Sequence, residues 1–394
     1  MIYILAFIVL IGVIVFVHEL GHFWAARSVG VGVERFSVGM PPNFIDFTKT
    51  KKGLVVDIFF FVFQDKKIKW EKAFSTTFSS FNTPSETIYT IGLLPLGGYV
   101  KMKGILDESM DSEFKGAEDE LESKNALQKI WVMSAGVIMN LILTFFVFVL
   151  MGKIDGDTSI QNNNTIIENV IPQQPAERAG IVVGDKILSM DNIEVETWDD
   201  IVTSISQNPD KTIPIVVERS GDIKILETTL GSRPNLTTGR VDQQIGTLGV
   251  FKNPVSIELN FQESIIYGFN KTKWAMTLMT SSLKMIFQGN VSRDEVGSVI
   301  MIGEMAGNAA QAGLVPFLYL MALISVNLAY INILPIPGLD GGHIALILIE
   351  VLMGRKLSVK TRIRIQSVGM FILLSLMVFL LFNDIMRVIT RVFS

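Results

Sequence analysis

The sequence has no cysteine and almost no histidine. Its 394 residues include no cysteine at all, and the histidines are His18, His22 and His343. Disulfide bonds, thiolate metal sites and a cysteine nucleophile are therefore excluded. Any zinc site must be assembled from these three imidazoles together with carboxylates.

Charge is also scarce, and the two signs nearly balance. Charged residues make up 18% of the chain, and its 34 lysines and arginines against 38 aspartates and glutamates give a formal net charge of −4. We therefore expect no nucleic acid among its partners. Hydrophobic residues make up 49% of the chain, and the mean hydropathy is +0.43. This composition is too apolar for a soluble enzyme of this size and predicts membrane spans.

The most distinctive stretch is a His-Glu-x-x-His pattern at residues 18–22, which follows an apolar run from the first residue. In a helix, His18 and His22 lie on the same face, so both imidazoles can reach one metal ion. Glu19 then lies close enough to take a proton from a water activated by the metal. The alternative is a helix with two incidental histidines. Burying an ionisable group at membrane depth costs about 2.5–3.5 kcal/mol, which favours a functional site.

The apolar segments predict a polytopic α-helical membrane protein with about four transmembrane helices. Residues 1–28 are long enough to span a bilayer as a helix, and they lack the basic start and the cleavage site of a signal peptide. The other regions are a second transmembrane helix at 130–152, a third transmembrane region at 297–353, and a fourth helix with its tail at 367–394.

Residues 29–129 are expected to form a membrane-associated β region and a loop. The apolar run at 53–63 is too short to span a membrane as a helix and favours a strand. A glycine pair then indicates a tight turn or bulge before an extended segment, which could bind substrate by strand addition or form a plain hairpin. This candidate substrate-binding segment consists of Gly97, Gly98, Tyr99, Val100, Lys101 and Met102. The acidic residues 108–124 are expected to form a flexible loop.

Residues 155–250 are soluble in character and rich in turns. Short strands alternate with helices, one of them capped by Thr197, and Ser220-Gly221 indicates a hairpin. This pattern resembles a PDZ domain, an α+β module that binds extended peptides at a sheet edge or serves as a steric gate. Residues 251–296 are amphipathic and are expected to lie along the membrane surface, with a soluble core helix as the alternative.

The third apolar region runs into the sequence Asn332-x-x-Pro-x-Pro-x-Leu-Asp340-Gly-Gly-His343. Its prolines and glycines break the helix, which is tolerated at membrane depth only inside protein or beside a water-filled cavity. Mixed sets of histidine and carboxylate occur in catalytic zinc sites, so Asp340 is favoured as the third ligand. His343 is the rival ligand, or a supporting residue. Asn140 in the second span needs a partner, and it either supports the site or joins two helices.

Charge between the last two spans predicts the orientation. Residues 354–366 form a basic loop with five lysines and arginines, which the positive-inside rule assigns to the cytoplasm. With four spans, both termini and the PDZ-like domain are then extracytoplasmic, and residues 29–129 are cytoplasmic.

Together these motifs resemble the site-2 protease family, and the bacterial RseP type with a single PDZ domain in particular. The resemblance covers nearly the whole chain, and it implies a multi-pass zinc metalloprotease of the bacterial inner membrane. Glu19 would be the general base, His18, His22 and Asp340 would bind one zinc ion, and Asn332 would position the substrate. Residues 97–102 would present that substrate as an extended strand.

The family acts in regulated intramembrane proteolysis, so the resemblance also implies substrates. These would be single-span membrane proteins already trimmed outside the membrane, such as anti-sigma factors or remnant signal peptides. The sequence departs from the family in having room for one PDZ domain, an expansion at about residues 44–90, and Gly136-Val137 where Gly-Pro is common. A zinc or proton-coupled transporter is the alternative from another class, but no internal repeat is apparent. An inactive membrane scaffold is a further alternative, against which the intact Glu19 argues.

Overall fold

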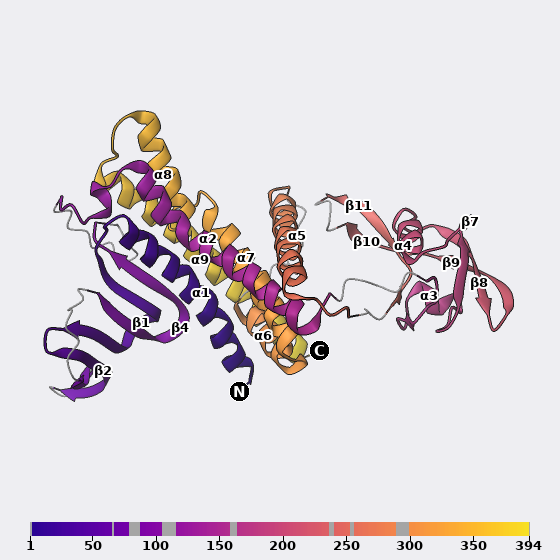
Figure 1. Ribbon diagram of the computed structural model, residues 1–394, viewed down its shortest axis with the longest axis horizontal. Coiled ribbons are helices and arrows are strands. Elements are labelled where there is room, and N and C mark those ends of the chain that lie inside the picture. Colours follow the sequence, from indigo (N-terminus) through magenta and orange to yellow (C-terminus); the bar gives the residue numbers. More distant parts are fainter. Residues whose placement is uncertain are drawn as a thin grey trace. The chain divides into compact units, whose positions relative to one another are not determined.

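The computed structural model describes residues 2–64, 67–78, 87–104, 116–157, 164–235, 240–252, 256–288 and 299–393. The chain divides into two compact units (Figure 1). The first unit contains residues 1–147 and 294–394, and the second contains residues 148–293.

Helices dominate the first unit, and α2 continues from it into the second. In the described part of the chain, four helices are long and apolar enough to cross a membrane, as the composition predicts. They are α1 (Ile2–Ser28), α2 (Ala126–Asp155), α7 (Leu314–Ile333) and α9 (Val359–Phe393), whose apolar part is Val359–Phe379. The shorter α6 (Val299–Ala312) and α8 (Asp340–Met353) flank α7 in sequence. At 1.5 Å per residue each of these two helices is roughly 21 Å long, which is less than a bilayer core.

A four-stranded antiparallel sheet in the order β3-β2-β1-β4 packs beside α1 (Figure 1). Its strands are β1 (Val33–Thr50), β2 (Gly53–Gln64), β3 (Lys67–Phe78) and β4 (Ile88–Met102). The strand predicted at 53–63 is therefore confirmed. Residues 88–91 of β4 pair with both ends of β1, whereas residues 98–102 pair only with Val33–Val38. Among the described residues, the other edge of this last segment has no neighbouring strand.

The expected loop at 108–124 contains one short helical turn. Residues 105–115 lie outside the described part of the chain, but Leu121–Ser123 form a 3-10 helix. Its central residue, Glu122, accepts hydrogen bonds from Lys129 and Arg362. These ion pairs fix a segment that its acidic composition alone suggests to be mobile.

The basic loop expected at 354–366 is also shorter than predicted. Helix α9 begins at Val359, so only residues 354–358 connect it to α8. The backbone N–H of Thr361 donates to Ser358 Oγ, which satisfies one of the free donors of the first turn. The basic side chains of residues 360–364 therefore project from a helix rather than from a loop.

The second unit has a small β core and one long helix. Its strands are β5 (Asn169–Val170), β6 (Lys186–Met190), β7 (Ile193–Glu194), β8 (Thr212–Arg219), β9 (Asp222–Thr229), β10 (Gly231–Asn235), β11 (Arg240–Thr247) and β12 (Val250–Phe251). Its helices are α3 (Pro175–Arg178), α4 (Trp198–Ser206) and α5 (Phe261–Phe287). The main sheet has the order β7-β6-β8-β9, and Ile187, Ile213 and Ile215 are fully buried in its core. The predicted cap is confirmed, because Thr197 forms a capping box with Asp200 at the start of α4.

Candidate metal centre

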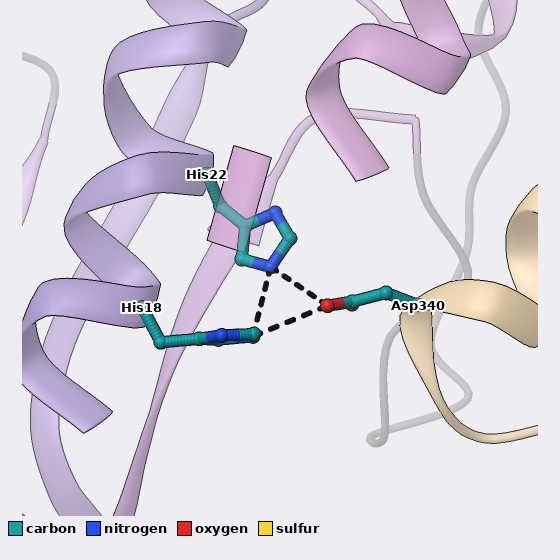
Figure 2. A group of neighbouring side chains, drawn as sticks. All are labelled: His18, His22 and Asp340. Carbon is teal, nitrogen blue, oxygen red and sulfur yellow. Dashed lines mark hydrogen bonds and ion pairs between the residues drawn. The ribbon is translucent and has the colours of Figure 1, made fainter. Parts of the chain in front are cut away.

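Two buried imidazoles on α1 face one point in the first unit. The spacing of four residues places His18 and His22 one turn apart, and their Nε2 atoms lie 3.2 Å from each other. Their residues are only 6% and 5% exposed, so neither ring has free access to solvent. Figure 2 shows the two rings converging from α1.

Asp340 completes the group from the opposite side (Figure 2). Its Oδ2 lies 3.1 Å from His18 Nε2 and 3.2 Å from His22 Nε2. Asp340 is the first residue of α8, where the partial positive charge of a helix N-terminus favours a carboxylate. Within the described residues, these three side chains form the one His/Asp/Glu group that could hold a metal ion.

The broken connection between α7 and α8 sets the position of Asp340. A Cβ on Gly341 would lie 2.2 Å from the carbonyl oxygen of Ile333, and one on Gly342 would lie 2.2 Å from that of Ile336. Only glycine fits at this distance, so the pair allows the start of α8 to fold back against the end of α7. The glycines thus explain why the carboxylate reaches the histidines.

The donor atoms fit a zinc ion. Zinc binds imidazole nitrogen and carboxylate oxygen at about 2.0–2.2 Å, so two ligands of a tetrahedral site lie roughly 3.3 Å apart. The three separations of 3.1, 3.2 and 3.2 Å match that edge length. Asp340 Oδ2 is buried and receives no hydrogen bond of suitable geometry. A cation at the centre would satisfy this oxygen.

Helix α2 packs directly against the two histidines. His22 Nδ1 donates to the carbonyl oxygen of Val132 at 2.8 Å, and the amide of Asn140 lies 3.2 Å from His18 Nδ1. A Cβ on Gly136 would lie 2.5 Å from His22 Nε2 and 2.6 Å from His18 Nε2. The contact of Asn140 with His18 agrees with one of the two alternatives that the sequence left open, namely that Asn140 supports the site. The parts played by Val132 and Gly136 were missed, and the one available signal was the small pair Ala135-Gly136 four residues before Asn140.

Two further predicted residues, Asn332 and Glu19, lie close to the candidate metal centre. Asn332, near the end of α7, has its side-chain Nδ2 3.3 Å from His18 Nε2. Glu19 is half-buried on α1, and a Cβ on Gly98 of β4 would lie 3.4 Å from Glu19 Cγ. The turn of β4 at Gly98 therefore passes beside the glutamate of the motif.

The predicted segment 97–102 lies at the edge of β4 that faces no other described strand. Val100 and Met102 are buried against the core next to α1, whereas Tyr99 and Lys101 are half-buried. Lys101 Nζ lies 3.4 Å from Glu34 Oε2. The side chains of Val100 and Met102 are thus committed to packing, and only their backbone is placed to meet another strand.

His343 lies apart from the three clustered residues. Both of its ring nitrogens face the side-chain amide of Gln366, at 3.3 and 3.2 Å. It lines a cavity of about 40 Å³ together with the charged residues Glu122, Lys129, Glu350 and Arg362. Burial disfavours ionisation of Glu122, but hydrogen bonds and charges from Arg362 and Lys129 outweigh it and lower the pKa of this carboxyl to about 2.

Comparison with known proteins gives a consistent result. The family model of peptidase family M50 matches residues 6–63 and 59–376. A Campylobacter jejuni protein that carries the name of a zinc metalloprotease is 34% identical over 98% of this chain and 94% of its own. A "Regulator of sigma-W protease RasP" of Bacillus subtilis is 25% identical over 98% of both chains. A "Zinc metalloprotease RasP" of Bacillus licheniformis is 26% identical over 98% of this chain and 99% of its own.

Proposed function

This chain belongs to peptidase family M50, the site-2 protease family of membrane zinc metalloproteases, and on that premise we propose that it cleaves single-span membrane proteins in or near their transmembrane segments. The zinc ligands are His18, His22 and Asp340, and Glu19 is the general base. Membership of an enzyme family also makes the transporter and scaffold alternatives unnecessary.

One observation carries the assignment of the ligands. Residues 18, 22 and 340 come from two helices more than 300 positions apart in sequence, yet their donor atoms lie 3.1–3.2 Å from one another. A lone ion pair would need only one imidazole beside the carboxylate. Two buried imidazoles and one buried carboxylate oxygen without a hydrogen bond are what a zinc ion would bring together.

The zinc ion, Glu19 and Asn332 would have different roles in catalysis. A zinc ion held by His18, His22 and Asp340 would supply the Lewis acid that polarises the scissile carbonyl and lowers the pKa of water. Glu19 takes the proton from the attacking water and delivers it to the leaving amine. Asn332, whose amide lies 3.3 Å from His18 Nε2, would orient a substrate group beside the zinc ligands.

The outer edge of β4, which faces no other described strand, supports the mode of substrate binding. A helical substrate hides its peptide groups in its own hydrogen bonds, so it must unwind before hydrolysis. Residues 98–102 have one paired edge, and Gly98 lies beside Glu19. An unwound substrate strand added at this edge would gain backbone hydrogen bonds close to the general base.

The substrates we propose are single-span proteins trimmed outside the membrane, such as anti-sigma factors or remnant signal peptides. The name of the B. subtilis relative, which refers to sigma-W, fits this class.

The second unit and the orientation belong to the same proposal. The sheet β7-β6-β8-β9 with α3 and α4 is consistent with a PDZ-like module that contacts substrate ectodomains or peptides. The basic residues at the start of α9 favour a cytoplasmic position for that end. Both termini and the PDZ-like unit would then be extracytoplasmic, in a bacterial inner membrane.

A matched pair of glutamate variants tests the proposal. Purified wild type, Glu19→Gln and Glu118→Gln would be incubated in detergent with a truncated single-span substrate, and zinc content would be measured in each. Glu118 is exposed and serves as the control. We expect cleavage by wild type and Glu118→Gln, no cleavage by Glu19→Gln, and about one zinc in all three. Cleavage by Glu19→Gln at the wild-type rate would refute the role of the base.

A further inference from the structure

Helix α2 presents a single stripe of residues to the two histidines. Val132, Gly136, Asn140 and Thr144 are spaced four residues apart, so they lie on one face of the helix. All four residues are buried. The stripe is therefore shaped for contact with α1 and α7 rather than for contact with lipid.

Two residues of the stripe, Val132 and Asn140, meet the rings at Nδ1, the nitrogen that does not face Asp340, whereas Gly136 lies against both Nε2 atoms. His22 Nδ1 donates to the carbonyl oxygen of Val132, which has no hydrogen of its own to give. The hydrogen of His22 must therefore be on Nδ1, and its Nε2 keeps a free electron pair toward the other ligands. The Nδ1 of His18 also faces α2, but its partner there is the side-chain amide of Asn140. One end of that amide, the NH2, donates a hydrogen bond, and the other, the oxygen, accepts one.

We propose that Asn140 is the positioning residue for His18, and that its side-chain oxygen accepts the Nδ1–H and so keeps the Nε2 electron pair free for zinc. This inference rests on the proposed zinc site and deepens it. Turning the amide by 180° exchanges its NH2 and its oxygen in the same space. Asn140 Oδ1 is buried and has no hydrogen bond where it stands, and turning it toward His18 Nδ1 would give it a donor.

The backbone of α2 at this point is held by α7. The carbonyl oxygen of Asn140 accepts from Thr144 Oγ1 at 2.9 Å and from Ser325 Oγ at 2.8 Å. Thr144 Oγ1 lies in addition 3.2 Å from the carbonyl oxygen of Ala322. Ser325 and Ala322 belong to the helix that also carries Asn332, on the Nε2 side of His18. The Nδ1 and Nε2 atoms of His18 thus face Asn140 of α2 and Asn332 of α7, and hydrogen bonds join these two helices.

Zinc affinity separates a positioning role from a structural one. Loss of a hydrogen-bond partner behind a metal-binding histidine typically costs 10- to 100-fold in affinity. Asn140→Leu keeps the branched shape of the side chain but removes the acceptor, so we expect a loss of about that size. Asn140→Asp keeps an acceptor and should bind zinc at least as tightly as wild type, because a carboxylate behind the ring raises its basicity. If Asn140 had only a structural role, Asn140→Asp should bind zinc more weakly than Asn140→Leu, because an aspartate buried at membrane depth is costly.

The experiment is a chelator-competition titration on full-length wild type, Asn140→Leu, Asn140→Asp and Asn308→Leu, all checked for folding by size exclusion. Asn308→Leu is the matched control, because Asn308 accepts from Tyr3 of α1 at 3.0 Å, roughly 22 Å along the helix from His18. It should bind zinc like wild type. Cleavage by Asn140→Leu should recover as free zinc is raised.

Each outcome has a distinct meaning. Wild-type affinity in Asn140→Leu overturns the inference, as does weaker binding by Asn140→Asp than by wild type. The aspartate variant decides the question by itself if the leucine variant does not fold. Failure of wild type to bind zinc would refute the proposed metal site instead, so the two failures are distinguishable.

Discussion

Replacing Gly136 with alanine should weaken zinc binding without unfolding the protein. The added methyl carbon would lie 2.5 Å from His22 Nε2 and 2.6 Å from His18 Nε2. Ordinary contact between such atoms is about 3.5 Å or more, so the overlap is on the order of 1 Å. The clash falls on the atoms that must bind the metal.

The magnitude follows from how the strain is distributed. Overpacking of this kind costs about 1–3 kcal/mol. Without zinc the two imidazoles can rotate away from the methyl group, whereas with zinc they are fixed. The cost therefore appears in the binding step, and at 1.4 kcal/mol per factor of ten it weakens zinc binding by about 5- to 150-fold. Alanine otherwise stabilises a helix interior by about 0.5–1 kcal/mol relative to glycine, so the zinc-free protein should be no less stable.

The assay compares Gly136→Ala with Gly12→Ala by zinc titration and by thermal unfolding with and without chelator. Gly12 also lies in a helix of this unit, but a Cβ there meets nothing within 4 Å. We expect weakened zinc binding only in Gly136→Ala. Wild-type zinc affinity in that variant would refute the close approach of α2 to the ligand atoms.

Three further outcomes follow from the same structure. Zinc removal from wild type should lower the unfolding temperature, because a ligand at 100 times its Kd stabilises by about 2.7 kcal/mol, and thermal scans with and without chelator measure this. Gly98→Ala should reduce cleavage on the order of tenfold to a hundredfold while zinc content stays unchanged. The reason is that the new Cβ would lie 2.6 Å from the Ser37 carbonyl oxygen and displace β4. Unaltered cleavage would argue against substrate addition at that strand. The pKa of Glu122 falls from 4.5 to about 2 in the folded protein, so its stabilisation is complete above pH 4.5 and disappears as the pH falls through about 2. Unfolding temperatures measured across this window should fall less steeply for Glu122→Gln than for wild type, and equal slopes would contradict the pairing with Arg362.

The sequence predicts best what depends on local spacing. The pairing of His18 with His22 follows from the pitch of one helix, and the strand at 53–63 follows from its length and composition. The helix cap at Thr197 depends on residues within one turn. Each of these signals is complete within a short window of the chain.

What the sequence cannot give is the approach of distant segments. Whether Asp340 or His343 joins the histidines depends on how α8 folds back on α7, although the two candidates are only three residues apart. The contact of Gly136 with both rings exists only when α2 packs on α1. The ion pairs of Glu122 with Lys129 and Arg362, which order a segment of acidic composition, likewise span up to 240 positions.

The central claim is that residues 18, 22 and 340 bind the catalytic zinc, and zinc-edge X-ray absorption with metal analysis tests it most directly. The measurement compares wild type with Asp340→Asn and His343→Gln. We expect about one zinc in wild type, with imidazole nitrogen and carboxylate oxygen at about 2.0–2.2 Å. His343→Gln should keep that spectrum, and Asp340→Asn should lose zinc or change its ligands. An unchanged spectrum and full zinc content in Asp340→Asn, with loss in His343→Gln, would contradict the account.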